Sequence, residues 1–213
     1  MMLDLSVDEV LSTTRAVRKR LDVSRPVPRA LLEECLALAL QAPNGANRNE
    51  WRWIIVDDPE TMAKLAREYR AAMGVLWDGQ RQGDAPVTAG VPHEDRLMDS
   101  AFSLAEKLDK MPAILIPLMP GRPDGKSVPE QAPMWGSIIQ AVWSFFLALR
   151  VRGLGSVWTT VASRREKEIA DLLGIPFDEF TQVGLFPIAY TMGTDFKPAW
   201  RRPVAEVLTY NKF

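Results

Sequence analysis

The 213-residue sequence predicts a single domain that contains both helices and strands. Capping signals and apolar repeats of helical period recur along the chain. Short runs of aromatic and β-branched residues lie between them, at residues 51–56, 113–118 and 182–190. No linker, internal repeat or low-complexity tract divides the chain, and its length suits one domain (residues 1–213) with a sizeable core.

The first elements follow from caps and prolines. Ser6 and Glu9 can form a capping box, which predicts a short helix leading towards Arg15. Residues 28–41 are expected to form the next helix, with proline in its first turn. Residues 51–56 then predict a strand.

A helix is expected from residue 57 or 58 to about residue 73, followed by another over residues 94–109. Between them, residues 74–92 are rich in Gly, Asp, Gln and Pro. Because they lack any periodicity, we expect a long irregular loop there, of the kind that often serves as a lid. Trp77 is the large aromatic residue of this segment.

In the second half, residues 113–118 predict a buried strand, and a Pro-rich loop is expected over residues 120–133. The most apolar helix should span residues 134–150, and a capping box at Ser163 and Glu166 should begin another that ends at Gly174.

Composition narrows the partners. With 26 basic and 27 acidic side chains the net charge is -1, so neither nucleic acid nor an anionic membrane is expected to bind. One cysteine and one histidine leave no disulfide and no zinc cluster. The N-terminus has no signal-peptide pattern, and the apolar stretch at residues 137–151 is too short to span a bilayer, so we expect a cytoplasmic protein.

Polar residues gather where the helix over residues 28–41 gives way to the strand over 51–56. The connecting sequence, residues 41–51, reads QAPNGANRNEW. Backbone and amide groups on such a loop suit a planar heterocycle with donors and acceptors on its edge. The pattern fits equally well a plain helix stop whose turn residues satisfy their own backbone.

Two basic segments offer phosphate ligands. Arg15 and Arg18 are three residues apart and share a face if the segment is helical, so both guanidinium groups could bind one phosphate. Residues 197–203 (KPAWRRP) add cations near the C-terminus. Each run alone is more often a solvated face. A further segment, residues 152–160 (RGLGSVWTT), joins an apolar helix to a β-branched strand.

In this order and spacing, the segments resemble the FMN-dependent nitroreductase family from about residue 11 to residue 210. The family's Arg-Arg-Ser-x-Arg motif corresponds to residues 14–18, Pro-Ser-x-x-Asn-x-Gln-Pro-Trp to residues 43–51, Gly-Leu-Gly-x-x-Trp to residues 153–158, and Arg-x-Pro to residues 201–203. The chain departs from these motifs at Thr14, Ala16, Asn49 and Glu50.

The resemblance implies an α+β fold with helices around a central mixed β-sheet, and an intertwined homodimer with two FMN sites built from both chains. It also implies that the tail, residues 196–213, crosses to the partner chain and adds an edge strand there. The alternating pattern of residues 204–210 fits such a strand, which needs a sheet to join.

The family motifs, carried over, assign residues to FMN. Those expected at the phosphate end are Arg15, Ala16, Arg18, Arg201 and Arg202. Those expected around the isoalloxazine are Pro43, Asn44, Gly45 and Asn47, the backbone of Thr159, Thr160 and Val161 near N5, and Lys107 beside the pyrimidine edge. The side chains of Thr159 and Thr160 fit a buried strand equally well, and Lys107 also fits a solvated helix position.

The implied activity is a ping-pong oxidoreductase: NAD(P)H delivers hydride to FMN and leaves, and a planar acceptor such as a nitroaromatic or a quinone takes its place. No side chain need donate a proton. Trp77 and Trp135 are candidates to stack on the acceptor, or else simply anchor their loops. Two alternatives remain, namely a flavin-consuming enzyme or reductive dehalogenase on the same fold, and a non-catalytic FMN-binding protein.

Overall fold

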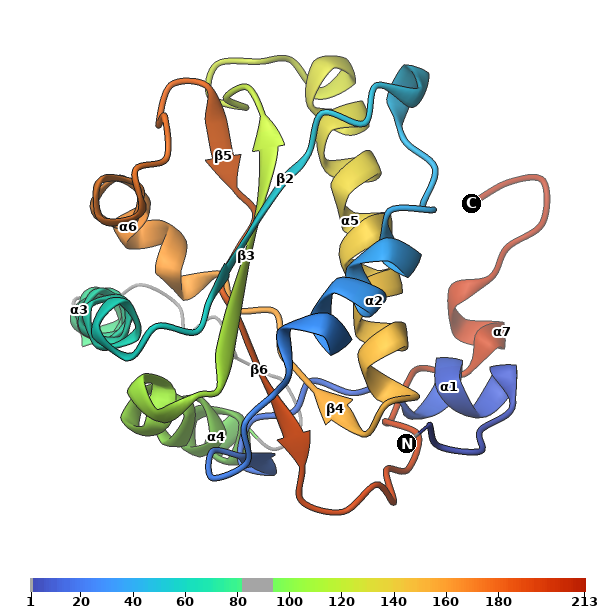
Figure 1. Ribbon diagram of the computed structural model, residues 1–213. Helices are drawn as coiled ribbons and strands as arrows, with labels where there is room; N and C mark the ends of the chain where they lie inside the picture. Colours follow the sequence, from blue (N-terminus) through green and yellow to red (C-terminus); the bar gives the residue numbers. More distant parts are fainter. Residues whose placement is uncertain (1, 82–93) are drawn as a thin grey trace.

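The computed structural model describes residues 2–81 and 94–213, with the backbone alone for residues 75–81 and 94 (Figure 1). A central sheet has helices on both faces, which confirms the predicted α+β class. The helices are α1 (Val7–Thr13), α2 (Arg29–Ala39), η1 (Gly45–Asn47), α3 (Pro59–Arg81), α4 (Glu94–Lys107), η2 (Leu108–Lys110), α5 (Val128–Arg150), η3 (Val161–Arg165), α6 (Glu166–Leu173) and α7 (Val204–Val207). The strands are β1 (Leu21–Asp22), β2 (Arg52–Val56), β3 (Ala113–Pro120), β4 (Leu154–Gly155), β5 (Phe180–Gln182) and β6 (Phe186–Thr191).

The sheet has the order β1-β6-β3-β2, with β4 paired to β6 and β5 paired to β3. The strand pairs described are antiparallel. Parallel pairing enters at an isolated bridge between Ala16 and Ser156, so the expected mixed character rests on that bridge. The bridge joins the N-terminal segment to the chain after β4.

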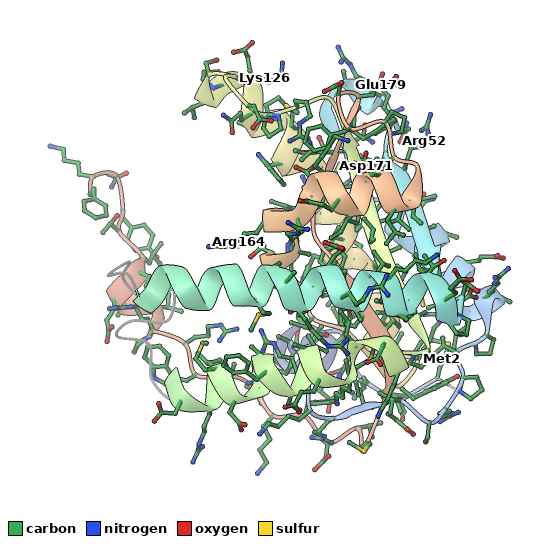
Figure 2. All side chains as sticks on the ribbon, turned by 90° about the vertical axis from the view of Figure 1, so that its left-hand side faces the viewer. Met2, Arg52, Lys126, Arg164, Asp171 and Glu179 are labelled. Atoms are coloured by element: carbon green, nitrogen blue, oxygen red, sulfur yellow. The ribbon has the colours of Figure 1, made fainter. Side chains whose placement is uncertain are left out.

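Strand β3 divides the core into two clusters because its side chains alternate between the faces of the sheet. Ile114 and Ile116 belong to the cluster under α3, α4 and α6, whereas Leu115 and Met119 belong to the cluster under α2 and α5. Figure 2 looks onto the first of these faces and shows α3 with α4 and α6 on either side of it. The sheet therefore holds two helical layers apart, one on each face.

Two expected loops are shorter than predicted. Helix α3 continues past residue 73 to Arg81, since Gly74 costs only about 1 kcal/mol in a helix that buries residues such as Leu65 and Ala72. Trp77 is therefore helical, and the remainder of the expected lid, residues 82–93, lies outside the described part of the chain.

Helix α5 begins at Val128, six residues before the predicted start. Ser127 and Glu130 form a capping box there, and Pro129 occupies the first turn, where a backbone N–H has no helical partner in any case. The helix therefore has 23 residues. By length and composition alone it could cross a membrane, but the core helix of a soluble protein meets the same two criteria. It packs Ile138, Val142 and Phe145 into the second core cluster.

One further prediction is wrong. The expected capping box of Ser163 and Glu166 is absent, because the Glu166 carboxylate accepts bonds from Arg122 and from the backbone N–H of Gln182. Of the tail segment expected to add a strand to a partner's sheet, Val204–Val207 form the short helix α7 in the single chain, and residues 204–210 are all exposed. The strand on the partner's sheet stays a prediction. A strand needs a neighbouring sheet edge, whereas a helical turn satisfies its own backbone.

Candidate functional site

Arg18 is the most informative residue of the site. The backbone N–H of Val17 donates to Ser156 O (2.9 Å), which fixes the segment that carries Arg18 against the chain after β4. Burial lowers the pKa of the half-buried Arg18 guanidinium, and the opposing influence comes from Tyr69. Within the described residues no carboxylate pairs with Arg18. A desolvated cation without an acid is suited to receive an anion from outside the chain.

Tyr69, on α3, interacts both with Arg18 and with Thr159, whose backbone is predicted to lie near the flavin. Burial raises the pKa of Tyr69, and the side chain of Thr159 and the charge of Arg18 oppose that shift. Thr159 Oγ1 in turn donates to Leu185 O (2.5 Å). The Thr159 side chain is thus committed to the fold. The next residue, Thr160, is exposed at the N-terminus of η3, and Val161 begins that turn.

Lys107 ends α4 and is not a freely solvated side chain. Its Nζ donates to Lys19 O (3.0 Å) and Leu21 O (3.3 Å), and burial lowers its pKa. It therefore holds the backbone that follows Arg18.

The other predicted phosphate ligands are exposed. Arg15 Nη1 donates to Lys197 O (2.7 Å), so this guanidinium is tied to the start of the tail. Ala16 is exposed beside it. Arg201 donates to the carbonyl of its own neighbour Trp200, and Arg202 lies 3.9 Å from Glu206. These four residues remain predicted phosphate ligands.

The loop over residues 43–51 is built from strained backbone. Ala46, Asn47 and Asn49 have φ between 53° and 55°, a left-handed conformation that is uncommon outside glycine. Asn44 and Asn49 hydrogen-bond each other twice, at 3.0 and 3.1 Å. Strain of this kind clusters at functional sites, although these two amides satisfy the loop itself.

A broad cavity of about 770 Å³ opens beside this loop. Gly45 is fixed there by a bond from its N–H to Ser137 Oγ (2.9 Å) on α5. The lining also includes Arg48, Glu50, Lys126 and Glu130, so the walls carry both signs of charge. Lys126 extends from the end of the molecule in Figure 2.

The predicted site residues fall into two groups at opposite ends of α5. The loop that follows α2 lies beside the N-terminal end of α5, and α1 lies beside its C-terminal end (Figure 1). Arg15, Ala16 and Arg18 follow α1, whereas Pro43, Asn44, Gly45 and Asn47 belong to the loop. One chain therefore does not bring the two groups together.

The two candidate stacking residues lie on helices. Trp135, on α5, is partly buried against the second core cluster. Trp77 lies on α3, and its side chain is outside the described part of the structure. Sequence reasoning missed Tyr69, because its spacing from Met62, Leu65 and Ala66 on α3 is that of an ordinary core position.

Cys35 is a core residue, as predicted. Its side chain is buried on α2, and burial raises the pKa of the thiol to about 11. A thiol that stays protonated is a poor nucleophile, so Cys35 offers no redox chemistry to the site. Among the described residues no group of three His, Cys, Asp or Glu side chains is placed to hold a metal.

Comparison with known proteins identifies the family to which the chain belongs. The nitroreductase family model matches residues 11–190. A Thermus thermophilus protein named NADH dehydrogenase is 42% identical over 60 residues, which make up 26% of this chain and 29% of that protein. An Archaeoglobus fulgidus protein that carries the name NADH dehydrogenase/NAD(P)H nitroreductase is 26% identical over 171 residues, 79% of this chain and 76% of that protein.

Solved structures share the fold at low identity. Iodotyrosine deiodinase bound to FMN and 3-iodo-L-tyrosine has a TM-score of 0.72 at 22% identity, with 98% of this chain and 100% of that chain covered. The FMN- and NADPH-dependent nitroreductase NfnB from Sphigopyxis sp. strain HMH has a TM-score of 0.71 at 20% identity, with the same coverage.

Proposed function

The chain belongs to the nitroreductase family, as its motifs predicted, and from this we propose that it is an FMN-dependent oxidoreductase that uses NAD(P)H to reduce a planar acceptor in a ping-pong cycle. The chemistry that bound FMN supplies is hydride transfer, so the protein need provide only binding, orientation and exclusion of water. A nitroaromatic or a quinone is the acceptor class we propose.

The observation that carries the proposal is the charge of half-buried Arg18, which no carboxylate of residues 2–74 or 95–213 pairs with. Taking a guanidinium partly out of water without a carboxylate costs free energy, and a bound phosphate offsets that cost through charge-assisted hydrogen bonds. The residues present therefore fit an anionic cofactor.

Other residues of this chain orient what binds. The hydrogen bond from Thr159 Oγ1 to Leu185 O holds the backbone before η3, where Thr160 and Val161 would face the ring. Lys107 fixes the backbone after Arg18, which places its own positive charge beside the segment that carries Arg18.

A complete site requires a second copy of the chain. The loop carrying Asn44 and Asn47 lies at the far end of α5 from Arg18, so we propose that the partner's loop covers the flavin held by this chain. Exposed apolar side chains support such an assembly. They lie at the C-terminal end of α2 and just after it (Leu38, Leu40), on α5 (Ile139, Trp143) and along the tail (Trp200, Val204, Val207, Leu208, Tyr210). We propose a homodimer in the cytoplasm, without nucleic acid or membrane as partner.

Two alternatives keep the fold and change the outcome. A flavin-consuming enzyme or a reductive dehalogenase would use the same cofactor site, and the near-equal TM-scores to a deiodinase and a nitroreductase do not separate them. A non-catalytic FMN-binding protein is the other, since Thr14 and Ala16 remove a charge and a hydroxyl from the family motif.

Steady-state oxidation of NADH and NADPH, with and without a quinone, tests the proposal. We expect a yellow protein that releases FMN on denaturation and whose NAD(P)H oxidation is accelerated by the quinone. A colourless protein that does not take up FMN would sink the proposal, and a yellow protein without turnover would favour the binding role. In the same assay, Trp135→Ala should raise KM for aromatic acceptors several-fold if Trp135 stacks, and should instead lower stability if it is an anchor.

A further inference from the structure

Arg150, the last residue of α5, is a buried cation held by neutral groups. Its side chain is only 5% exposed. Nε and Nη2 donate to Thr13 Oγ1 at 3.2 and 3.0 Å, and Nη2 also donates to Thr194 O at 3.0 Å. Burial lowers the pKa of Arg150, the charge of Arg20 lowers it further, and Glu9 opposes them. Such a cation is expensive to bury, which indicates a role beyond stability.

The two acceptors of Arg150 belong to different segments of the proposed flavin site. Thr13 ends α1 and directly precedes residues 14–18, which carry Arg15 and Arg18. Thr194 stands at the start of the segment that leads to Arg201. A single guanidinium therefore connects the two stretches of chain that carry the proposed phosphate ligands.

Other arginines hold the same stretch before the tail. Arg20 donates to Met192 O (2.8 Å) and to Asp195 Oδ1 (2.6 Å). The ring of Phe196 has the guanidinium carbon of Arg20 at 4.3 Å from its centroid and that of Arg150 at 5.1 Å. These contacts and the bond from Arg15 to Lys197 O fix residues 192–197. We call this set of contacts the arginine clamp.

We propose that Arg150 is a positioning residue for the phosphate end of the flavin site, acting through the arginine clamp. This inference rests on the proposed function. It does not require Arg150 to touch the cofactor: its fork sets the distance between residues 14–18 and the cations of the tail. Loss of the fork should therefore weaken recognition of the phosphate and leave recognition of the ring largely intact.

The experiment compares dissociation constants of apoprotein for FMN and for riboflavin, which lacks the phosphate, by flavin fluorescence. For Arg150→Met we expect the affinity for FMN to fall about tenfold or more, as for a charge-supported contact, and that for riboflavin to change less than about threefold. Arg150→Lys keeps the charge without the fork and should recover only part of the loss. Thr13→Val, which removes one acceptor at similar volume, should show the same preference for FMN at smaller size.

Ser156→Ala is the matched control. Its hydroxyl is buried without a hydrogen-bond partner and lines the same small cavity of about 10 Å³ as Arg150 and Phe196. This variant should leave the ratio of the two dissociation constants unchanged. Cleavage by trypsin after Arg201 gives a second readout, and it should accelerate in Arg150→Met and not in Ser156→Ala.

An equal loss of both flavins, or an unchanged ratio in Arg150→Met and Thr13→Val, would overturn the positioning role. If Arg150→Met does not fold, the ratio measured with Thr13→Val and Arg150→Lys decides. A wild-type protein that binds neither flavin would instead remove the proposed function, and the inference with it. Normal FMN binding by the wild type with unchanged ratios in the variants would refute the inference alone.

Discussion

The two ends of α5 satisfy their polar groups in opposite ways. At the N-terminal end, Asn44 and Asn49 pair with each other, and the charges around the 770 Å³ cavity are of both signs. At the C-terminal end, Arg18 is half-buried with no carboxylate partner among the described residues, and buried Arg150 donates to the neutral acceptors Thr13 Oγ1 and Thr194 O. The amide groups of the first end are satisfied within the chain. The second end contains a half-buried guanidinium that no described carboxylate neutralises.

This difference indicates how the site is divided. A half-buried cation that no described carboxylate neutralises gains most from an anion, so we propose that the phosphate binds at that end. At the N-terminal end the backbone is strained but the amides are satisfied, so the loop provides a preformed wall. The rest of the fold offsets the free-energy cost of that strain. Because the two ends of one chain face different surroundings, we interpret them as halves of two sites, each completed by a second copy.

The largest expected effect comes from deleting residues 196–213. The tail carries exposed Trp200, Val207 and Tyr210, which have too little apolar mass to fold alone, and it also carries the proposed phosphate ligands Arg201 and Arg202. We expect a monomer or insoluble material without flavin, measured by size-exclusion chromatography with light scattering and by absorbance of released flavin. Deletion of residues 211–213 alone serves as the control. A soluble truncated dimer that keeps FMN would break the division between the two ends.

Arg18→Ala should have the next largest effect. Losing one charged phosphate contact costs about 1.5 to 3 kcal/mol of binding, so FMN affinity should fall roughly tenfold to a hundredfold. Binding of riboflavin should be much less sensitive. Isothermal titration of the apoprotein with both flavins measures this, with Arg18→Lys as the charge-preserving control. Equal losses for the two flavins would show that the C-terminal end of α5 does not receive the phosphate.

Local signals in the sequence predicted much of the fold. The capping box at Ser6 is present, and Gly174 ends α6 in the left-handed conformation. Helix boundaries were predicted wrongly where the helix around a Gly or Pro overrides the local preference of that residue. Gly74 predicts a break although helix α3 continues past it to Arg81, and Pro129 predicts a loop although it suits the first turn of α5.

The site was predictable only where a motif carried it. Arg15 and Arg18 stood out by spacing. Arg150 did not, because it ends an apolar helix and acquires its role from Thr13 and Thr194, both more than forty residues away in sequence. Contacts between distant segments of this kind leave no local pattern, and the same holds for the bond from Thr159 Oγ1 to Leu185 O.

The smallest expected effect sharpens the comparison at the N-terminal end of α5. Ala46 is exposed and has φ 54° and ψ 19°, a conformation that costs an L-residue about 1 to 2 kcal/mol. Ala46→Gly relieves this strain but adds chain entropy of about 0.4 to 1 kcal/mol to the unfolded state, so we expect a net gain of about 0.5 to 1 kcal/mol in unfolding free energy. Urea unfolding at unchanged m-value measures it. The adjacent Gly45→Ala is the control, since a Cβ there would meet Ser137 Oγ at an ordinary 3.5 Å and the site has no left-handed φ. If Ala46→Gly lowered stability instead, the loop would not store strain, and the contrast with the charge-rich end would rest on electrostatics alone.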